Sequence, residues 1–167
     1  GGHIVVWTSL YQDVSGNAAS GIFSQRYDAD GARVGPEEQV NTLTAGSQST
    51  PFVTGLSDGG YFVTWADDTN LDPSGTGVVG QRFDAAGAPV GSSMLINQTT
   101  SNTQYHPEVA ELQNGSLMAV WSGYNTSVGD QDVWGRIIAP DGTMSDEFRV
   151  NANTTRTQDL PSIAVLD

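Results

Sequence analysis

The sequence predicts an all-β protein, a β-propeller-like array of three four-stranded antiparallel blades. One unit of about 55 residues occurs three times, marked by residues that recur at nearly constant intervals. These markers are Trp7, Trp65 and Trp121, the prolines Pro51, Pro107 and Pro161, and the turn glycines Gly31, Gly87 and Gly142. No stretch carries an apolar stripe at helical spacing, so we expect strands only.

Each unit is expected to contain four short strands. In the third copy these are residues 106–112, 116–121, 132–138 and 147–151, which are rich in β-branched and aromatic residues. The dipeptides Asn114-Gly115 and Asp141-Gly142 lie between them, and such pairs supply the positive φ of tight hairpin turns. The third copy is therefore predicted to form an antiparallel meander.

The unit is split between the two ends of the chain. Residues 1–7 match the second strand of the unit, and residues 160–167 match its first strand. The first blade is thus expected to comprise residues 1–41 together with 159–167, completed by the C-terminal strand. The second blade is expected at 48–97 and the third at 104–151. A closing strand of this kind hides the edges of the sheets in propellers.

Three blades are fewer than the four to eight of typical propellers. Three arrangements are compatible with three blades in one chain. Two chains join in a six-bladed ring, the chain is a segment of a longer array, or the three sheets pack more tightly than in a typical propeller. The sequence analysis favours the homodimer.

Composition excludes several classes of function. The chain has no Lys and no Cys, and six Arg face 19 Asp and Glu, for a formal net charge of −13. This balance argues against nucleic acid and anionic membrane surfaces, which require basic patches. No apolar run is long enough to span a membrane, so no membrane insertion is expected.

The long polar loops between the second and third strands carry the candidate site residues. Aromatic and amide side chains there suit sugar binding, and closely spaced carboxylates suit Ca²⁺, which prefers oxygen ligands. The candidate ligand-binding residues are Tyr11, Asp13, Asn70, Tyr124 and Asn125. The candidate metal ligands are Asp67, Asp68, Asp72, Asp130 and Asp132. The alternative, which the sequence favours over metal binding, is a set of solvated acidic loops.

The tryptophans are interpreted as packing residues between blades rather than as ligand-facing residues. The third strand of each unit keeps a small residue at Ser24, Gly80 and Gly135. A tryptophan on the neighbouring strand is expected to lie over that position.

A family resemblance rests on three quoted motifs of the repeat. These are P-x-V-x-x-L, D-G-G-Y-F-V-T-W and G-V-V-G-Q-R-F-D-A-A-G, followed by a Val/Ile-Asn pair. The pattern resembles the propeller-type repeats of large secreted bacterial RTX or adhesin-like surface proteins, over essentially the whole chain. The resemblance implies an extracellular or cell-surface location, a calcium-rich environment and a role in adhesion or scaffolding. The glycine-rich RTX nonapeptide is absent, so its mode of calcium binding is not carried over.

The predicted function is a non-enzymatic extracellular binding module that presents its repeated loops to a glycan or a cell-surface protein. The alternative is a structural or oligomerisation scaffold of a giant surface protein, without a small-molecule ligand. No enzyme is expected, because the two histidines, His3 and His106, complete no Ser-His-Asp set, and His106 precedes Pro107 at a structural position. A glycosidase with two carboxylates stays open, since their separation cannot be read from sequence.

Overall fold

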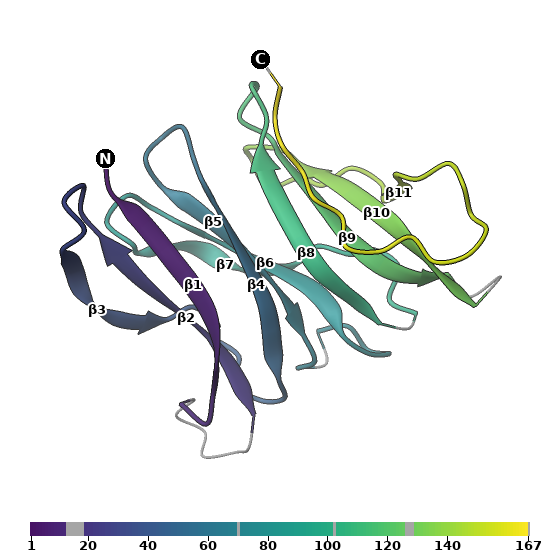
Figure 1. Ribbon diagram of the computed structural model, residues 1–167, viewed down its shortest axis with the longest axis horizontal. Helices are drawn as coiled ribbons and strands as arrows, with labels where there is room; N and C mark the ends of the chain where they lie inside the picture. Colours follow the sequence, from purple (N-terminus) through teal and green to yellow (C-terminus); the bar gives the residue numbers. More distant parts are fainter. Residues whose placement is uncertain (13–18, 70, 102, 126–128, 167) are drawn as a thin grey trace.

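The fold consists of strands. The computed structural model describes residues 1–12, 19–69, 71–101, 103–125 and 129–166, and these form strands and no helix (Figure 1). Accordingly, the described residues include no helix able to cross a membrane. The all-β, propeller-like fold class predicted from the sequence is confirmed.

Three antiparallel sheets stand side by side, and the array is not closed into a ring (Figure 1). The first has the order β1-β2-β3, the second β4-β5-β6-β7 and the third β11-β10-β9-β8. The strands of the first sheet are β1 (His3–Leu10), β2 (Ser20–Tyr27) and β3 (Arg33–Gln39). Those of the second are β4 (Gln48–Gly55), β5 (Tyr61–Asp67), β6 (Gly77–Phe83) and β7 (Pro89–Leu95). Those of the third are β8 (Gln104–Glu111), β9 (Leu117–Asn125), β10 (Asp130–Ile138) and β11 (Phe148–Arg149).

The turn between the third and fourth strands of a unit is held by its own aspartate. Asp84 Oδ1 accepts hydrogen bonds from the amides of Ala86 and Ala88 at 2.9 and 2.8 Å. Gly87 takes a φ of 89°, which a glycine adopts at no steric cost. The carboxylate is therefore occupied by backbone donors, as expected of an Asx turn.

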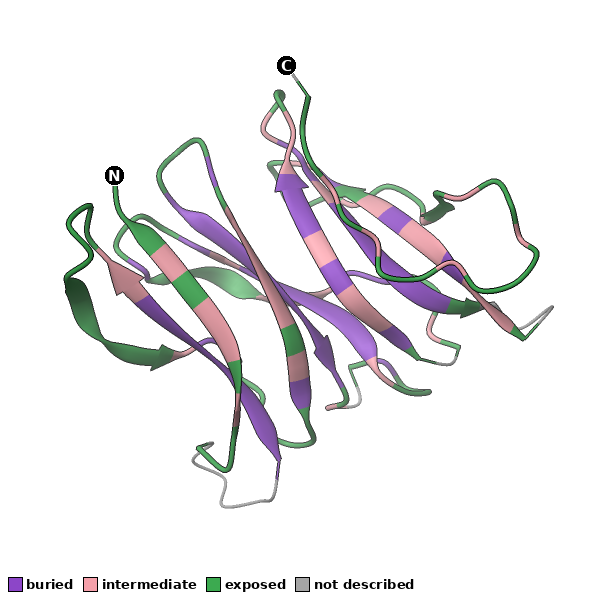
Figure 2. Ribbon diagram, viewed as in Figure 1, coloured by how far each residue is buried: buried purple, intermediate pink, exposed green. Residues whose placement is uncertain are grey.

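Two hydrophobic cores fill the spaces between adjacent sheets. The core between the first and second sheets contains Ile22, Val40, Tyr61, Val63, Trp65, Val79 and Phe83. The core between the second and third contains Leu56, Phe62, Val78, Ile96, Val109, Leu117, Ala119, Trp121 and Ile138. Every residue of β5 is buried because both faces of its sheet are covered (Figure 2). The predicted packing role of Trp65 and Trp121 is confirmed.

The small residue of the third strand faces a different neighbour from the one predicted. A Cβ on Gly80 would lie 2.5 Å from Phe62 Cε1 and 2.8 Å from Ile96 Cδ1. On Gly135 it would lie 2.7 Å from Met118 Cε. The expectation that a tryptophan covers this position is wrong. The tryptophan is displaced by one residue along the neighbouring strand, so its side chain lies on the opposite face of the sheet.

An asparagine and a glutamine join each sheet to the next, and we call each pair an Asn–Gln clasp. Asn97 accepts a hydrogen bond from the Val78 amide at 2.8 Å and donates to Gln104 Oε1 at 3.3 Å. Gln104 in turn donates to the Ser101 carbonyl at 3.0 Å. The other clasps are Asn41–Gln48 and Asn151–Gln158. The clasp links the last strand of one unit to the first strand of the following unit.

Residues 158–166, here the terminal segment, do not pair with the first sheet. They lie along β8 (Figure 1), where the Ile163 amide donates to Glu108 Oε2 at 3.0 Å. The Leu160 amide donates to Ser122 Oγ at 3.1 Å. The first sheet therefore has three strands in this structure, and the expected completion of the first blade by the C-terminal strand of the same chain does not occur. The physical reason is that β4 and β8 stand between the terminal segment and β1.

Candidate active site

The aspartates predicted to bind metal are held by donors of the protein. The buried Asp67 accepts hydrogen bonds from Trp65 Nε1 and the Thr69 amide, both at 2.9 Å. The buried Asp72 accepts from Asn97 Nδ2 at 2.7 Å, and the buried Asp132 accepts from Asn151 Nδ2 at 2.6 Å. These three carboxylates thus stabilise loop and clasp geometry.

Asp68 and Asp130 have other surroundings. Asp68 Oδ1 accepts a hydrogen bond from the Ser47 amide at 2.5 Å, and Asp130 begins β10. Within the described ranges, no three His, Cys, Asp or Glu residues come together in a way that suits a metal ion. Calcium in these loops stays a prediction.

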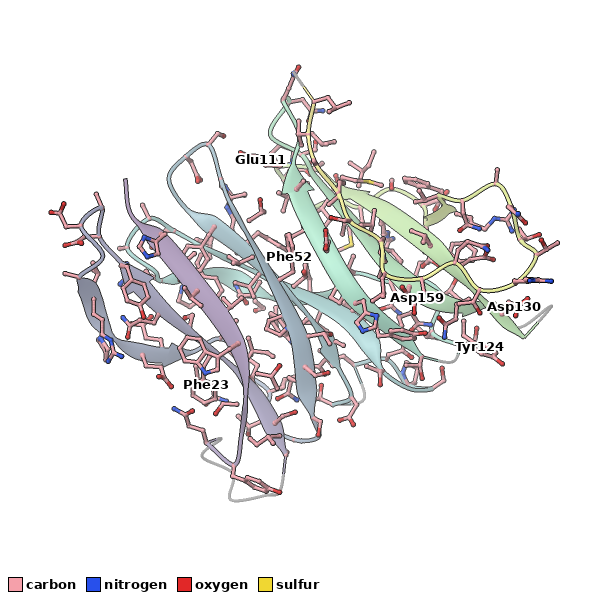
Figure 3. The ribbon with its side chains drawn as sticks, viewed as in Figure 1. Phe23, Phe52, Glu111, Tyr124, Asp130 and Asp159 are labelled. Carbon is pink, nitrogen blue, oxygen red and sulfur yellow. The ribbon has the colours of Figure 1, made fainter. Side chains whose placement is uncertain are left out.

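The candidate ligand-binding residues belong to different sheets. Tyr11 follows β1 and is 73% exposed, whereas Tyr124 lies in β9 and is 42% exposed. Tyr124 and Asp130 lie at one end of the third sheet (Figure 3). Asp13, Asn70 and the side chain of Asn125 lie outside the described residues. The second sheet separates the two tyrosines, so the structure does not bring them into one site.

A different surface gathers chemically competent side chains. The first strands of successive units, β4 and β8, and the terminal segment lie side by side and enclose a groove of about 280 Å³, which we call the inner groove. Its lining residues are Thr50, Pro51, Phe52, His106, Pro107, Glu108, Leu160, Pro161 and Ser162. The groove is thus built from one short stretch of each repeat.

The backbone in these stretches is strained at equivalent positions. Thr50, His106 and Leu160 have φ values of 49°, 51° and 55°, each directly before a proline. Residues with a Cβ seldom adopt positive φ, and the strain costs about 1–3 kcal/mol per residue. The pairing of β4 with β5 and of β8 with β9 shifts register at the same place. The surrounding sheet therefore enforces a bulge that is repeated along the inner groove.

His106 lines the inner groove and lies close to Asp159, the residue before the groove-lining Leu160. His106 Nδ1 lies 3.6 Å from Asp159 Oδ1 and has no hydrogen-bond partner among the described residues. Asp159 Oδ1 also accepts hydrogen bonds from Ser122 Oγ at 2.5 Å and the Leu160 amide at 2.7 Å. The edge of the Tyr105 ring packs against His106, with centroids 4.8 Å apart. Figure 3 shows Asp159 near the beginning of β8.

The pKa of Asp159 is set by opposing effects. Burial raises the pKa of this carboxyl, but hydrogen bonds from Ser122 and the Leu160 amide, with His106 beside it, lower the pKa more. Its net pKa therefore lies below the ordinary value of 3.8. Asp159 is ionised at neutral pH.

Glu108 supplies a carboxyl to the lining of the inner groove. Its Oε2 accepts a hydrogen bond from the Ile163 amide at 3.0 Å. Among the described residues, Glu108 Oε1 and Asp159 Oδ2 have no hydrogen-bond partner. Each carboxyl is thus oriented through one oxygen and free to react through the other.

Acidification is expected to loosen the terminal segment. Because the pKa of Asp159 is lowered in the folded protein, its contribution to stability is complete above about pH 3.8 and is lost as the pH falls through the lower folded pKa. We expect the amide resonance of Leu160 to titrate below pH 3.8 in an NMR series. Asp159→Asn should abolish this titration, and an unchanged titration in that variant would contradict the assignment.

These residues were not predicted from the sequence, because the first strand of each unit was interpreted as structural. A usable signal was present in departures from the repeat. The positions equivalent to Glu108 are Phe52 and Ser162, and the residue equivalent to Asp159 is Ser49 in the second unit. Charged residues at positions where other copies carry apolar or small ones indicate a role that the fold alone does not require.

Comparison with known proteins gives structural relatives only. No family model and no curated protein matches the sequence. The endo-arabinase of Bacteroides thetaiotaomicron is similar in structure with a TM-score of 0.57 and 13% identity, over 91% of this chain and 59% of the arabinase. The xylan β-1,4-xylosidase of Bacillus halodurans has a TM-score of 0.56 and 18% identity, over 99% of this chain and 33% of the xylosidase. A Dyadobacter fermentans protein of unknown function has a TM-score of 0.58 and 13% identity, over 89% of this chain and 50% of its own length.

These similarities bear on the fold, and the chain spans less than two thirds of each of these proteins. Two of the three are enzymes, an arabinase and a xylosidase. This finding contradicts the predictions of a non-enzymatic binding module, of a scaffold, and of a chain that is not an enzyme. We expected no enzyme because the sequence lacks a Ser-His-Asp set. Glycoside hydrolysis does not need that set; it needs two carboxyl groups that the fold brings together.

Proposed function

We propose that the protein is a glycoside hydrolase that cleaves a neutral, pentose-containing polysaccharide at the inner groove. The observation that carries the proposal is that two carboxyls, Glu108 and Asp159, are each tethered through one oxygen where the terminal segment follows β8, with His106 Nδ1 3.6 Å from Asp159 Oδ1. The fold shared with an arabinase and a xylosidase supports both the reaction and the substrate class.

The two carboxyls have different roles in this proposal. Hydrolysis breaks the bond between the anomeric carbon and the leaving oxygen, and water supplies a hydroxyl to the sugar and a proton to the leaving group. Asp159 is the ionised partner, because its pKa is lowered, and it removes the proton from the attacking water or itself attacks the anomeric carbon. Glu108 is the acid that protonates the leaving oxygen through Oε1.

His106 orients the reacting groups. Its Nδ1 lies 3.6 Å from Asp159 Oδ1, and its side chain is 38% exposed toward solvent. His106 also has a positive φ of 51°, and strained backbone of this kind is often found at functional sites. A sugar hydroxyl bound between His106 and Asp159 would be held by both.

Charge supports a neutral substrate. The chain carries a formal net charge of −13, and the residues that line the inner groove include the carboxyl of Glu108 and no Arg. An anionic polymer such as a polyuronate would be repelled by this field. Arabinan and xylan carry no such charge on their main chains.

The direct test is hydrolysis of purified polysaccharides followed by release of reducing ends. We expect activity on arabinan or xylan and none on polygalacturonate, with heat-denatured protein as the control. Absence of release from every neutral polysaccharide, with circular dichroism showing a folded β protein, would overturn the proposal.

The context inferred from the repeat resemblance is a separate proposal. We infer an extracellular location, since polysaccharides of this size do not enter cells and the sequence resembles repeats of secreted surface proteins. Detection of the native protein in the culture medium would support it, and confinement to the cytoplasmic fraction would contradict it.

A further inference from the structure

Ser122 is a serine of β9 whose hydroxyl contacts Asp159. Its side chain is fully buried, and its Oγ donates a hydrogen bond to Asp159 Oδ1 at 2.5 Å. The same Oγ accepts a hydrogen bond from the Leu160 amide at 3.1 Å, and this amide also donates to Asp159 Oδ1 at 2.7 Å. The hydroxyl, the amide and one carboxylate oxygen thus form a closed set of three contacts. Together these contacts orient Asp159 through Oδ1.

The packing of one unit against the next does not require this contact. One unit earlier in the array, the residue equivalent to Ser122 is Ala66, and the residue equivalent to Asp159 is Tyr105. Ala66 is buried, and its strand β5 contacts β8 without a hydroxyl at that position. The pair of a hydroxyl and a carboxylate therefore occurs where the repeat itself demands neither group.

The other groups that face Asp159 do not replace this hydrogen bond. Among the described residues, Asp159 takes part in one ion pair, with His106 at 3.6 Å. Burial, with the charge of Asp159 beside it, raises the pKa of the Tyr105 phenol, so this phenol is uncharged at neutral pH. Burial also raises the pKa of Asp159, and the Ser122 hydroxyl has the largest of the effects that lower it.

We propose that Ser122 is a positioning residue for the hydrolysis at the inner groove, an inference that rests on the proposed function. Its hydroxyl occupies Oδ1 of Asp159, so Oδ2 is the oxygen presented to the attacking water or to the anomeric carbon. Ser122 is fully buried and does not line the inner groove, so it acts through Asp159. A reacting group that is held in one orientation lowers the barrier, because less freedom is lost in the transition state.

The order of the three polar groups is not that of a serine nucleophile. In a Ser-His-Asp set, the histidine lies between the serine and the carboxylate. Here Asp159 lies between Ser122 and His106. The hydroxyl of Ser122 therefore keeps its proton throughout the reaction and forms no bond to the sugar.

Ser122→Ala tests the proposal, and the equivalent position of the second unit already holds a buried alanine, Ala66. We expect kcat to fall by about 10- to 100-fold and KM to stay within about threefold of the parent value. The acid limb of the profile of kcat/KM against pH should move to higher pH. The reason is that loss of a hydrogen bond to the charged form raises the pKa of Asp159.

Ser122→Thr is the rescue variant. It keeps the hydroxyl, and the first unit has Thr8 at the equivalent position. We expect Ser122→Thr to have a kcat within about threefold of the parent and the acid limb of the parent. A loss as large as that of Ser122→Ala, in a variant that circular dichroism shows to be folded, would overturn the proposal.

Ser20→Ala is the matched control. Ser20 is also a buried serine that joins one sheet to the first strand of the following unit, because its Oγ donates to the Gln48 carbonyl at 2.7 Å. It lies in β2 and does not line the inner groove. We expect kcat within about twofold of the parent and an unchanged acid limb. Equal effects of Ser20→Ala and Ser122→Ala would overturn the proposal, since a general loss of stability would explain both.

Carbon-13 NMR of the Asp159 carboxyl supplies a measurement that does not depend on activity. Its resonance is assigned as the titrating signal that Asp159→Asn removes. In Ser122→Ala we expect this carboxyl to titrate at higher pH. We also expect the three-bond couplings of the carboxyl carbon to change from values of a single χ1 rotamer to averaged values.

The two measurements separate a failure of this inference from a failure of the proposed function. Unchanged titration and couplings of Asp159 in Ser122→Ala would overturn the inference, whatever the protein hydrolyses. Hydrolysis by the parent with unchanged kcat and pH profile in Ser122→Ala would do the same. If the parent hydrolysed no polysaccharide while the titration and couplings changed as expected, the proposed function would be wrong. Ser122 would then still be shown to orient Asp159.

Discussion

Replacing Glu108 with Gln or Asp159 with Asn is expected to lower kcat on the cleaved polysaccharide by about 10²- to 10⁴-fold. Each change keeps the shape of the side chain and removes its ability to donate or accept a proton. Because Glu108 and Asp159 each use one oxygen to hold the terminal segment, the amide replacements retain an acceptor for the Ile163 and Leu160 amides. The loss should therefore fall on kcat rather than on folding. Steady-state kinetics of reducing-end release measures it.

Glu111→Gln is the matched control for this prediction. Glu111 lies on the same strand as Glu108, but its carboxylate accepts hydrogen bonds from the amide and hydroxyl of Ser57, at 2.6 and 3.0 Å. It lies toward the far end of β8 (Figure 3), and it does not line the inner groove. We expect Glu111→Gln to leave kcat within about twofold of the parent, since it contacts no reacting group. An equal loss of kcat in Glu108→Gln and Glu111→Gln would contradict the proposed role of Glu108. Full activity of Glu108→Gln would also contradict it.

Asn97→Ala is expected to lower the free energy of unfolding by about 2–5 kcal/mol. The change removes a side chain that bonds four groups, and it leaves the Val78 amide, Asp72 and Gln104 without that partner inside the protein. A buried donor or acceptor without a partner costs about 1–3 kcal/mol. The total is a large fraction of the 5–15 kcal/mol that typically stabilises a domain. Urea unfolding monitored by tryptophan fluorescence measures the change.

The equivalent substitution at another clasp is the internal control. Asn151 makes the same set of contacts, but its own side chain is half-buried rather than buried. Asn151→Ala should therefore cost about 1 kcal/mol. If Asn97→Ala and Asn151→Ala lowered the free energy of unfolding equally, burial of the Asn97 clasp would not be the cause of the loss in Asn97→Ala.

The repeat and its strands could be predicted because their causes are local. Asn114-Gly115 and Asp141-Gly142 specify turns by the φ values they permit, and the structure has turns at both glycines, with φ of 77° and 85°. Trp65 and Trp121 were predicted to pack between blades and both are buried, although neither lies over the small residue from which that prediction was argued. Such signals depend on residues that are close together in the sequence, so they can be read without the tertiary structure.

The loop aspartates illustrate what local reasoning could not decide. Asp67 and Asp72 have the oxygen chemistry of calcium ligands. In the structure their donors are Trp65 Nε1 and Asn97 Nδ2, the second of which is remote in sequence. Whether a carboxylate meets a metal, water or a protein donor depends on which groups the fold places beside it.

The sequence by itself determined the class of fold, the repeat and the positions of the strands, since hydrophobic alternation and turn chemistry act over short distances. Only the tertiary structure decided that the terminal segment follows β8, where Asp159 lies beside His106 and Glu108 accepts a hydrogen bond from the Ile163 amide. Both outcomes depend on how the sheets pack against one another. That packing results from the two hydrophobic cores between them, and no single stretch of sequence contains it.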